Sequence, residues 1–386
     1  MDLNRLKTAP QYGAFAMNNK KASGCSILVI RLGAVGDVVR TFPALALLKA
    51  SMPEARLCYM TEEDSLKLLE KSPVLDEVLL FPRRRLSSLA KRPFGAVRTF
   101  LETLAFVKNL RKKRFEIVID MHGIFKSGLI SRLSGAPLRA GFAKEFTREL
   151  NHFFLNRQIA PAPSSQTRVE RNLDLALSLA PSSFPQLDRL AMPISLDLDA
   201  SERNRLAPFL HRLAERKAAH TPVIFLNPFV SKRGRYKAWP LGYYAKLATM
   251  LHKNLGAYIG IVYGPGEAKG AAELERASKG SAVIAPQTSL KGLMALLSVA
   301  HVFVTADTGP MHLAGLTAVR IVALFGPSEP LLNAPMGKDS VVVYKKAPCA
   351  PCRNRECIVR VCMRSISPEE VFKRICALLQ EDAIAK

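Results

Sequence analysis

The sequence lacks long apolar runs. No stretch approaches the roughly 18–20 uninterrupted apolar residues of a membrane-spanning helix. The longest candidate, residues 290–305, is interrupted by Lys291, Ser298 and His301. The first 23 residues are polar and basic and do not contain the apolar segment of a secretory signal. We therefore expect residues 1–23 to form a mobile basic tail, and the protein to be cytoplasmic.

Acidic residues are scarce compared with basic ones. The 386 residues include 32 Asp and Glu against 56 Lys and Arg, which gives a net charge of +24. The cations recur in short runs at 83–85, 91–92, 111–114 and 232–233 instead of gathering in one tail. A solvated surface explains any single run. The summed excess predicts phosphate-bearing ligands or an anionic membrane surface rather than a dedicated nucleic-acid arm.

Cysteines are few outside one cluster. Three of the seven are isolated, and the other four lie within fourteen residues: Cys349, Cys352, Cys357 and Cys362. Four thiols can bind zinc, but the last two gaps exceed the usual paired spacing. A disulfide is disfavoured in a reducing cytoplasm. The spacing leaves a structural metal, a disulfide and free structural thiols as open alternatives.

Buried apolar runs alternate with helical patterns twice along the chain. The first series has strands at about 26–30, 56–61, 77–81 and 115–120, and the second begins at 222–226 after Pro/Ser-rich stretches at 160–164 and 181–199. This alternation predicts an α/β fold with parallel sheets. We expect an N-terminal domain over 24–195 and a C-terminal domain over 196–365. A final helix within 366–386 is expected to pack back on the first domain.

The first polar motif, residues 31–37 (RLGAVGD), follows a predicted strand and opens a helix. Gly33 and Gly36 permit a tight turn and close approach of a ligand to the backbone. The third glycine of the dinucleotide fingerprint is absent, which argues against a Rossmann dehydrogenase. Asp37 at the mouth of this turn is either a helix N-cap or a reactive carboxylate.

A second motif, VIDMHG at 118–123, also ends a predicted strand. Asp120 and His122 are therefore expected at the ligand-binding edge of the sheet. His122 has two interpretations, a polar turn residue or a substrate contact.

The second half has further turns of this kind. Residues 227–240 (NPFVSKRGRYKAWP) hold four cations after a strand, and this charge suits a diphosphate, although a solvated loop remains the alternative. The turns YGPGE at 263–267, TADTGPMH at 305–312 and LFGPSE at 324–329 also follow predicted strands. Asp307, Thr308 and Gly309 precede a helix whose free N–H groups favour an anion, and His312 lies in its first turn. Several such turns in one domain predict a nucleotide-sugar site.

These motifs, in this order, resemble the bacterial ADP-heptose:lipopolysaccharide heptosyltransferases, glycosyltransferase family 9. The resemblance rests on IRLGAVGDVVRTFPAL, the DMHG and KS residues at 120–127, KAWP, YGPGE, TADTGPMHLAG and ALFGPSEP, and spans about residues 26–372. It implies the GT-B architecture: two facing Rossmann-like domains with a cleft between them, the acceptor mainly on the first and the donor on the second.

The resemblance also implies roles for single residues. Asp37 looks like the general base of an inverting displacement, and Lys237 resembles the lysine that contacts the donor diphosphate. The other donor-site residues implied are Glu267, Asp307, Thr308, Gly309 and His312. The acceptor-side residues are Gly36, Asp120, His122 and Lys126. We expect desolvation to raise the pKa of Asp37 toward neutrality, with nearby cations working in the opposite direction.

The implied reaction transfers a heptose from ADP-heptose to the lipopolysaccharide inner core, either Kdo-lipid A or heptosylated core. We expect no cofactor and no catalytic metal, because cations and helix dipoles serve the leaving group. The enzyme is expected to be a monomer, peripheral to the inner face of the inner membrane, with no nucleic-acid partner. The alternatives are a GT-B enzyme that uses or epimerises another nucleotide sugar, such as a 2-epimerase, and a polyanion-binding Rossmann-like protein.

Overall fold

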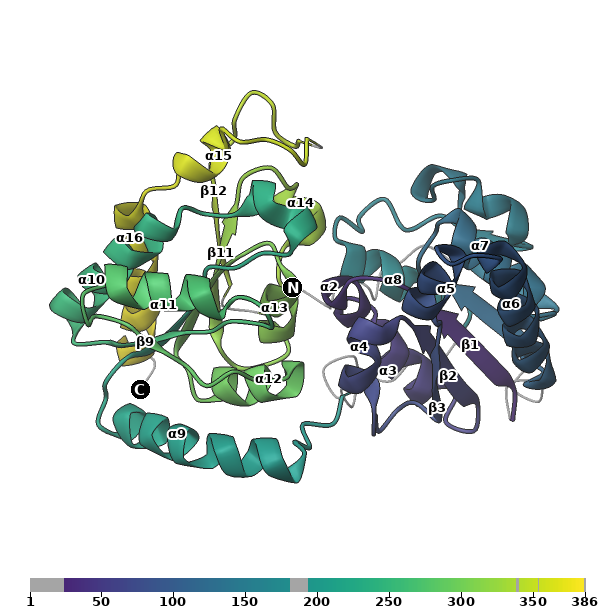
Figure 1. The fold of residues 1–386 in the computed structure, drawn as a ribbon, viewed down its shortest axis with the longest axis horizontal. Helices are drawn as coiled ribbons and strands as arrows, with labels where there is room; N and C mark the ends of the chain where they lie inside the picture. Colours follow the sequence, from purple (N-terminus) through teal and green to yellow (C-terminus); the bar gives the residue numbers. More distant parts are fainter. Residues whose placement is uncertain (1–23, 181–193, 338–339, 353, 385–386) are drawn as a thin grey trace. The chain divides into compact units, whose positions relative to one another are not determined.

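The structure is a computed structural model that describes residues 24–180, 194–337, 340–352 and 354–384. The basic tail expected at 1–23, and most of the second Pro/Ser-rich stretch, lie outside the described residues. The chain divides into two compact units, one ending at Ser195 and one running from Leu196. Each unit is an α/β layer structure (Figure 1).

The first unit contains a sheet of six parallel strands in the order β3-β2-β1-β4-β5-β6. Its strands are β1 (Ser26–Ile30), β2 (Arg56–Thr61), β3 (Glu77–Leu80), β4 (Ile117–Asp120), β5 (Leu138–Phe142) and β6 (Arg157–Ile159). Its α-helices are α2 (Val35–Val39), α3 (Phe42–Ser51), α4 (Glu63–Leu69), α5 (Arg83–Ala90), α6 (Gly95–Lys112), α7 (Phe125–Leu133) and α8 (Arg168–Leu177).

The second unit repeats this topology, with the sheet order β12-β11-β10-β7-β8-β9. Its strands are β7 (Val223–Asn227), β8 (Tyr258–Ile261), β9 (Val283–Ile284), β10 (Val302–Ala306), β11 (Arg320–Phe325) and β12 (Val341–Tyr344). Its helices are α9 (Ala200–Ala218), the 3-10 helix η5 (Lys232–Lys237), α10 (Leu241–Leu255), α11 (Ala268–Ala277), α12 (Leu290–Ser298), α13 (Gly309–Ala314), α14 (Pro330–Asn333), α15 (Val361–Arg364) and α16 (Pro368–Ile384).

The central strands are buried on both faces. β7 (VIFLN) has no exposed residue, and in β1 (SILVI) only Ser26 is partly exposed. Unbroken apolar runs of this kind are typical of parallel sheets covered by helices on both sides. In the second unit two apolar clusters, one around Tyr244 and one around Phe303, occupy opposite faces of the sheet. Each unit therefore has its own core, and the carboxyl ends of its strands are left for ligands.

The sequence analysis missed three elements of the first unit, namely β5, β6 and α8. β5 (LRAGF) and β6 (RQI) are short and carry charged or polar residues. α8 follows the Pro/Ser-rich stretch at 160–164 and begins with a capping box in which Thr167 and Glu170 bond each other's backbone N–H groups. The local signal for this helix was the Thr-x-x-Glu pattern at 167–170.

The C-terminal helix α16 packs on the second unit. Val371, Ile375 and Leu378 belong to the same apolar cluster as Trp239, and the Trp239 indole N–H donates to the Ile366 carbonyl over 2.9 Å. The Trp239 ring also meets Tyr243 and Tyr244 edge to face. The expectation that the final helix packs back on the first domain was wrong, because its apolar face completes the core of the second unit.

Among the described helices, none is both long enough and apolar enough to cross a membrane.

The Trp239 contacts give a stability prediction. We expect Trp239→Ala to lower the free energy of unfolding of the second unit by about 3–5 kcal/mol, because a large buried ring and its hydrogen bond are lost. Denaturant unfolding followed by far-UV circular dichroism measures this. Ile358→Ala is the matched control, since its side chain is 84% exposed, and we expect a change within about 0.5 kcal/mol. Equal losses in both variants would contradict the anchoring role.

Candidate functional site

The first cluster of polar residues lies where β1 and β4 are neighbours in the sheet. In this strand order the crossovers leave the two strands in opposite directions, which opens a crevice at their carboxyl ends. Ile30 and Asp120 are register partners at these ends. Arg31 follows β1 directly, so the residues of the first two sequence motifs are brought together at one edge.

The glycine turn after β1 is tight. Gly33 has a φ of +120°, which L side chains rarely adopt, and the His122 ring lies over it. The helix α2 then begins at Val35, with Ala34 at its N-cap. Asp37 is therefore not the N-cap but a residue of the first turn, and Gly36 beside it is buried.

Three guanidinium groups surround the Asp37 carboxylate. Arg31 Nη2 lies 2.9 Å from Oδ2, and Arg40 Nη1 lies 2.7 Å from Oδ1. Arg168, the first residue of α8, places Nη1 3.6 Å from Oδ1. The Arg31 side chain also donates to the Met121 carbonyl over 2.7 Å, which ties the first turn to the loop after β4. One carboxylate facing three cations leaves a positively charged site.

This arrangement corrects the expected pKa of Asp37. Burial raises the pKa of this carboxyl, but Arg31, Arg40 and Arg168 together outweigh the effect and hold it well below its ordinary value of 3.8. Asp37 is therefore a fully ionised carboxylate throughout the physiological range. From the sequence, burial was expected to outweigh the cations and to move the pKa of Asp37 toward neutrality.

Asp120 holds the loop after β4 through several hydrogen bonds. Its side chain is completely buried and accepts hydrogen bonds from the backbone N–H groups of His122 (2.8 Å) and Gly123 (3.1 Å). Asn151 Nδ2 donates to its other oxygen over 2.7 Å. Burial raises the pKa of Asp120, against the effect of these donors. These contacts hold the loop after β4 in place, and the acceptor contact expected for Asp120 stays a prediction.

His122 and Lys126 lie at the same edge of the sheet. Burial, with Arg31 and Lys126 nearby, lowers the pKa of His122 to about 3, so its imidazole is neutral. Lys126 Nζ pairs with Glu62 Oε1 over 2.6 Å and lies 4.9 Å from the centre of the Phe81 ring. Glu62 is nearly buried and also pairs with Arg83 over 3.2 Å.

The second cluster occupies the equivalent crevice between β7 and β10. Asn227 at the end of β7 is the register partner of Thr305 in β10, and its Nδ2 donates to Thr305 Oγ1 over 2.9 Å. The Thr305 and Thr308 hydroxyl oxygens are 3.2 Å apart. Thr308 is the N-cap of α13, and Gly309 is its first residue. Hydroxyl and backbone N–H groups thus gather at one strand end, as the sequence predicted.

Asp307 lies between Lys237 and His312 in this cluster. Lys237 Nζ, at the end of η5, lies 2.6 Å from Asp307 Oδ2, and His312 Nε2 lies 3.8 Å from Oδ1. Both Asp307 and His312 are buried. Burial raises the pKa of Asp307, but His312 and Lys237 outweigh it and hold the carboxyl below its ordinary range. The structure therefore joins three donor-site residues predicted from distant motifs.

Glu267 has a local partner. Its Oε2 accepts from the Gly264 backbone N–H over 2.6 Å, which closes the turn after β8. Burial raises the pKa of Glu267, partly offset by this hydrogen bond.

Sequence reasoning assigned no role to several residues of these clusters. Arg31 and Asn227 lie inside the quoted motifs, so their position at the end of a strand could have identified them as site residues. Arg40 also lies inside a quoted motif, three residues after Asp37. Arg168 and Asn151 had no comparable signal, because long-range folding brings them to the site.

The clustered cysteines are free thiols. Sulfur atoms of Cys352 and Cys357 accept backbone N–H groups from Asn354 (3.3 Å) and Arg360 (3.4 Å). Over the described ranges, no three His, Cys, Asp or Glu side chains are grouped closely enough to hold a metal ion.

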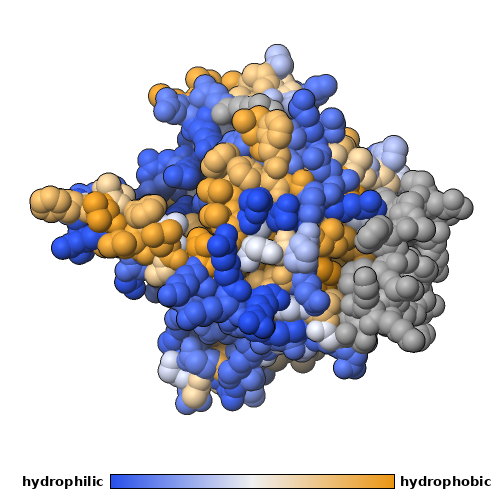
Figure 2. Space-filling view, turned by 90° about the vertical axis from the view of Figure 1, so that its right-hand side faces the viewer, coloured by the Kyte–Doolittle hydropathy of each residue, from blue (hydrophilic) through white to orange (hydrophobic). Residues whose placement is uncertain are grey.

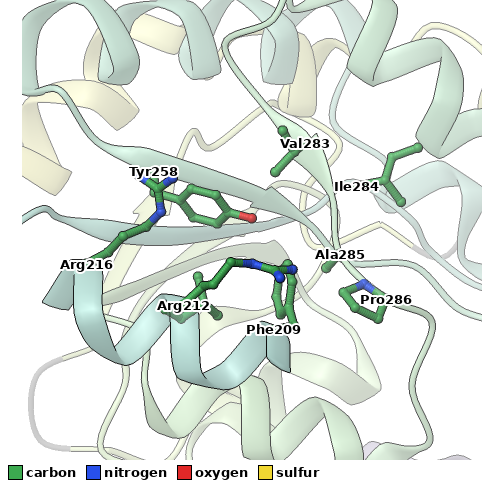
Figure 3. A pocket seen from close by; sticks show the side chains of 9 residues that line it. Phe209, Arg212, Arg216, Tyr258, Val283, Ile284, Ala285 and Pro286 are labelled. Carbon is green, nitrogen blue, oxygen red and sulfur yellow. The ribbon is translucent and has the colours of Figure 1, made fainter. Parts of the chain in front are cut away.

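The second unit contains a cavity of about 460 Å³ (Figure 3). Residues of α9, β8 and β9 line it, and its two arginines lie near aromatic rings: Arg212 beside Phe209 and Arg216 beside Tyr258. It contains none of the predicted site residues.

Comparison with known proteins places this geometry in a family. The model of glycosyltransferase family 9 (heptosyltransferase) matches residues 103–362. Lipopolysaccharide heptosyltransferase 1 of Pseudomonas aeruginosa is 26% identical over 374 residues, covering 92% of this chain and 98% of that protein. The core heptosyltransferase OpsX of Haemophilus influenzae is 25% identical, covering 83% and 85%.

Solved structures share the fold. A family 9 glycosyl transferase from Veillonella parvula superposes with a TM-score of 0.70 at 20% identity, covering 93% of this chain and 98% of that chain. The Escherichia coli heptosyltransferase WaaC with ADP gives a TM-score of 0.68 at 23% identity, covering 92% and 99%. The same enzyme is also known with ADP-2-deoxy-2-fluoro heptose. The chain therefore belongs to glycosyltransferase family 9, the heptosyltransferase family, and is a glycosyltransferase with the two-domain GT-B fold.

Proposed function

We propose that this enzyme transfers a heptose from ADP-heptose to the lipopolysaccharide inner core, Kdo-lipid A or a heptosylated core, with inversion at the anomeric carbon. The observation that carries the proposal is Asp37, an ionised carboxylate held by arginines at the β1/β4 crevice. The relatives named above as lipopolysaccharide heptosyltransferases support the donor and acceptor classes. So does the ADP bound in the Escherichia coli structure.

In the proposed reaction Asp37 accepts the proton of the acceptor hydroxyl. The hydroxyl oxygen forms the new bond to the anomeric carbon while the bond from that carbon to the diphosphate breaks, and ADP leaves with the electron pair. A carboxylate with a depressed pKa is ionised before the reaction and releases the proton readily afterwards. It is a weak base at rest, so its contribution comes mainly from position and from the developing charge on the sugar.

The arginines around Asp37 suit an anionic acceptor. Arg31, Arg40 and Arg168 exceed the one carboxylate in charge, so the crevice attracts phosphate or carboxylate groups. Inner-core acceptors of the kind proposed carry such groups. Neutral His122 and the Lys126–Glu62 pair then border the acceptor, while Asp120 keeps the loop in place.

The donor diphosphate is proposed to bind at the second crevice. Lys237 supplies a cation, Thr308 a hydroxyl, and Gly309 a backbone N–H at the start of α13. His312 and Asp307 hold Lys237 in place, and Glu267 orders the neighbouring turn, next to the nucleotide or sugar. Cations and N–H dipoles stabilise the leaving ADP in this scheme, which requires neither a cofactor nor a catalytic metal. We further propose that the enzyme acts as a monomer in the cytoplasm, at the inner face of the inner membrane.

The first experiment measures ADP release from ADP-L-glycero-β-D-manno-heptose with Kdo-lipid A or a partial core as acceptor. Acceptor-dependent release supports the proposal. Release that needs no acceptor, or release only with another nucleotide sugar, would overturn the heptose assignment.

Asp37→Asn tests the base. We expect kcat to fall about 10²–10⁴-fold, because the amide cannot accept the proton, while calorimetric affinity for ADP stays unchanged. Asp64→Asn is the matched control, since Asp64 is an exposed carboxylate paired with Arg84, and should retain full activity. Full activity in Asp37→Asn would remove the proposed base without changing the family.

The arginines predict a pH dependence. The folded pKa of Asp37 lies below 3.8, so its ion pairs stabilise the folded state above that pH and lose this effect as the pH falls through the folded value. The kcat/KM profile should therefore show no acid limb from Asp37 down to about pH 4. In Arg40→Ala the pKa rises and the limb moves to higher pH. Arg56→Ala, which removes an exposed pair with Glu77, should leave the limb in place. An unshifted limb in Arg40→Ala would contradict this account.

Lys237→Ala tests the diphosphate site. We expect the Kd for ADP to rise about tenfold to a hundredfold, the usual effect of losing a charged hydrogen bond. Lys237→Arg should recover part of the affinity, and Lys253→Ala, an exposed lysine of α10, should have no effect. Isothermal titration calorimetry measures all three, and thermal melting confirms that each variant is folded. Unchanged ADP affinity in Lys237→Ala would place the diphosphate elsewhere.

A further inference from the structure

The helix α6 has two apolar faces, and only one faces the core. On the inner side, Phe106 meets the Phe81 ring edge to face at 5.6 Å between centroids, and Leu110 is 3% exposed. Thr99 and Thr103 complete this partly buried side. The core of the first unit is therefore satisfied without the residues on the other side of the helix.

The outer face carries large apolar side chains in contact with solvent. Val97, Phe100, Leu101 and Leu104 are 47–62% exposed, and Phe94, just before the helix, is 85% exposed. The spacing of the four helical residues, i, i+3, i+4 and i+7, puts them on a single stripe. We call these five residues the α6 stripe. A contiguous apolar stripe on the surface marks an interaction site more often than scattered single residues do.

Cations enclose the stripe. Residues 83–114, which cover α5 and α6, contain 11 Lys and Arg but a single acid, Glu102, and that acid pairs with Arg85. Lys91 and Arg92 precede the stripe, Arg98 lies within it and Lys108 follows it; all four are exposed. Within the described part of the chain, none of these four has a carboxylate partner.

We propose that the α6 stripe and its cations form the surface by which the enzyme docks on an anionic phospholipid bilayer. The apolar side chains enter the boundary between headgroups and acyl chains, and the cations contact lipid phosphates. Figure 2 turns this side of the first unit to the viewer and shows apolar residues gathered among hydrophilic ones. The inference rests on the proposed function in one respect, because a lipid-anchored acceptor requires an enzyme at the bilayer.

Charge argues against a second copy of the chain as the occupant. A twofold interface centred on the stripe would bring the same cations of both copies together, with one paired acid on each to offset them. A nucleic acid would satisfy the cations but leave the apolar stripe in water. An anionic bilayer satisfies both features.

Co-sedimentation with vesicles tests the surface. We expect the enzyme to bind vesicles of phosphatidylcholine mixed with phosphatidylglycerol, and to bind those of phosphatidylcholine alone much more weakly. Phe100→Asp/Leu104→Asp should weaken binding on the order of a hundredfold, since two apolar side chains no longer enter the bilayer. Lys91→Glu/Arg92→Glu should weaken it at least about tenfold.

Each variant has a matched control on the second unit. Ile358→Asp changes an apolar residue that is even more exposed, at 84%, and Lys217→Glu/Lys253→Glu reverses two exposed cations. Both controls should bind as the wild type does. Equal losses in variants and controls would reduce the effect to net charge or general hydrophobicity and overturn the proposal. Two other results would also overturn the proposal. One is a wild-type dimer, seen by light scattering, that becomes monomeric in Phe100→Asp/Leu104→Asp. The other is DNA that displaces the enzyme from vesicles by binding the same residues.

Activity separates this inference from the proposed function. With a de-acylated, soluble acceptor, the α6 variants should release ADP at the wild-type rate, and with the acceptor embedded in anionic vesicles they should be slower. Normal release together with no vesicle binding by the wild type would overturn the docking surface alone. Vesicle binding without release on any acceptor would overturn the heptose assignment and leave the surface intact.

Discussion

The parallel pairing of β1 with β4, and of β7 with β10, is the constraint on which both candidate sites depend. Each pairing joins strands that are not consecutive in their unit, so the polypeptide leaves the two strand ends in opposite directions. Backbone hydrogen bonds hold the strands in register, with Ile30 opposite Asp120 and Asn227 opposite Thr305. The polar residues beyond these ends therefore meet without having to be close in sequence.

Both sites pair a carboxylate with basic side chains. A carboxylate removed from water is costly unless it is paired, and the partly buried Asp37 and the buried Asp307 are each held by nearby basic side chains. The two sites differ in how far their positive charge exceeds their negative charge. Asp37 faces three guanidinium groups that are always charged, whereas Asp307 faces one ammonium and a histidine. The first site thus keeps a fixed positive excess, and the second is closer to neutral.

The sequence predicted the strand ends well because their signal is local. The runs SILVI and VIFLN are almost entirely apolar; Arg31 and Gly33 follow the first, and the second ends in the amide Asn227. β5 and β6 escaped notice because one contains an internal arginine and glycine and the other is three residues long. The pairing of Lys237 with Asp307 could be expected from strand-end motifs, but the approach of Arg168 to Asp37 could not. The pKa of Asp37 is depressed mainly by Arg31 and Arg40, which are near it in sequence, and Arg168 adds to their effect.

The sole tryptophan of the chain has an optical consequence. Trp239 is buried in the second unit, two residues after Lys237, and its ring is packed against Tyr243 and Tyr244. Emission excited at the red edge of the protein absorption band therefore arises from the second unit alone. The protein contains a built-in fluorophore close to its proposed diphosphate lysine, so the second unit can be observed separately from the first without an added label.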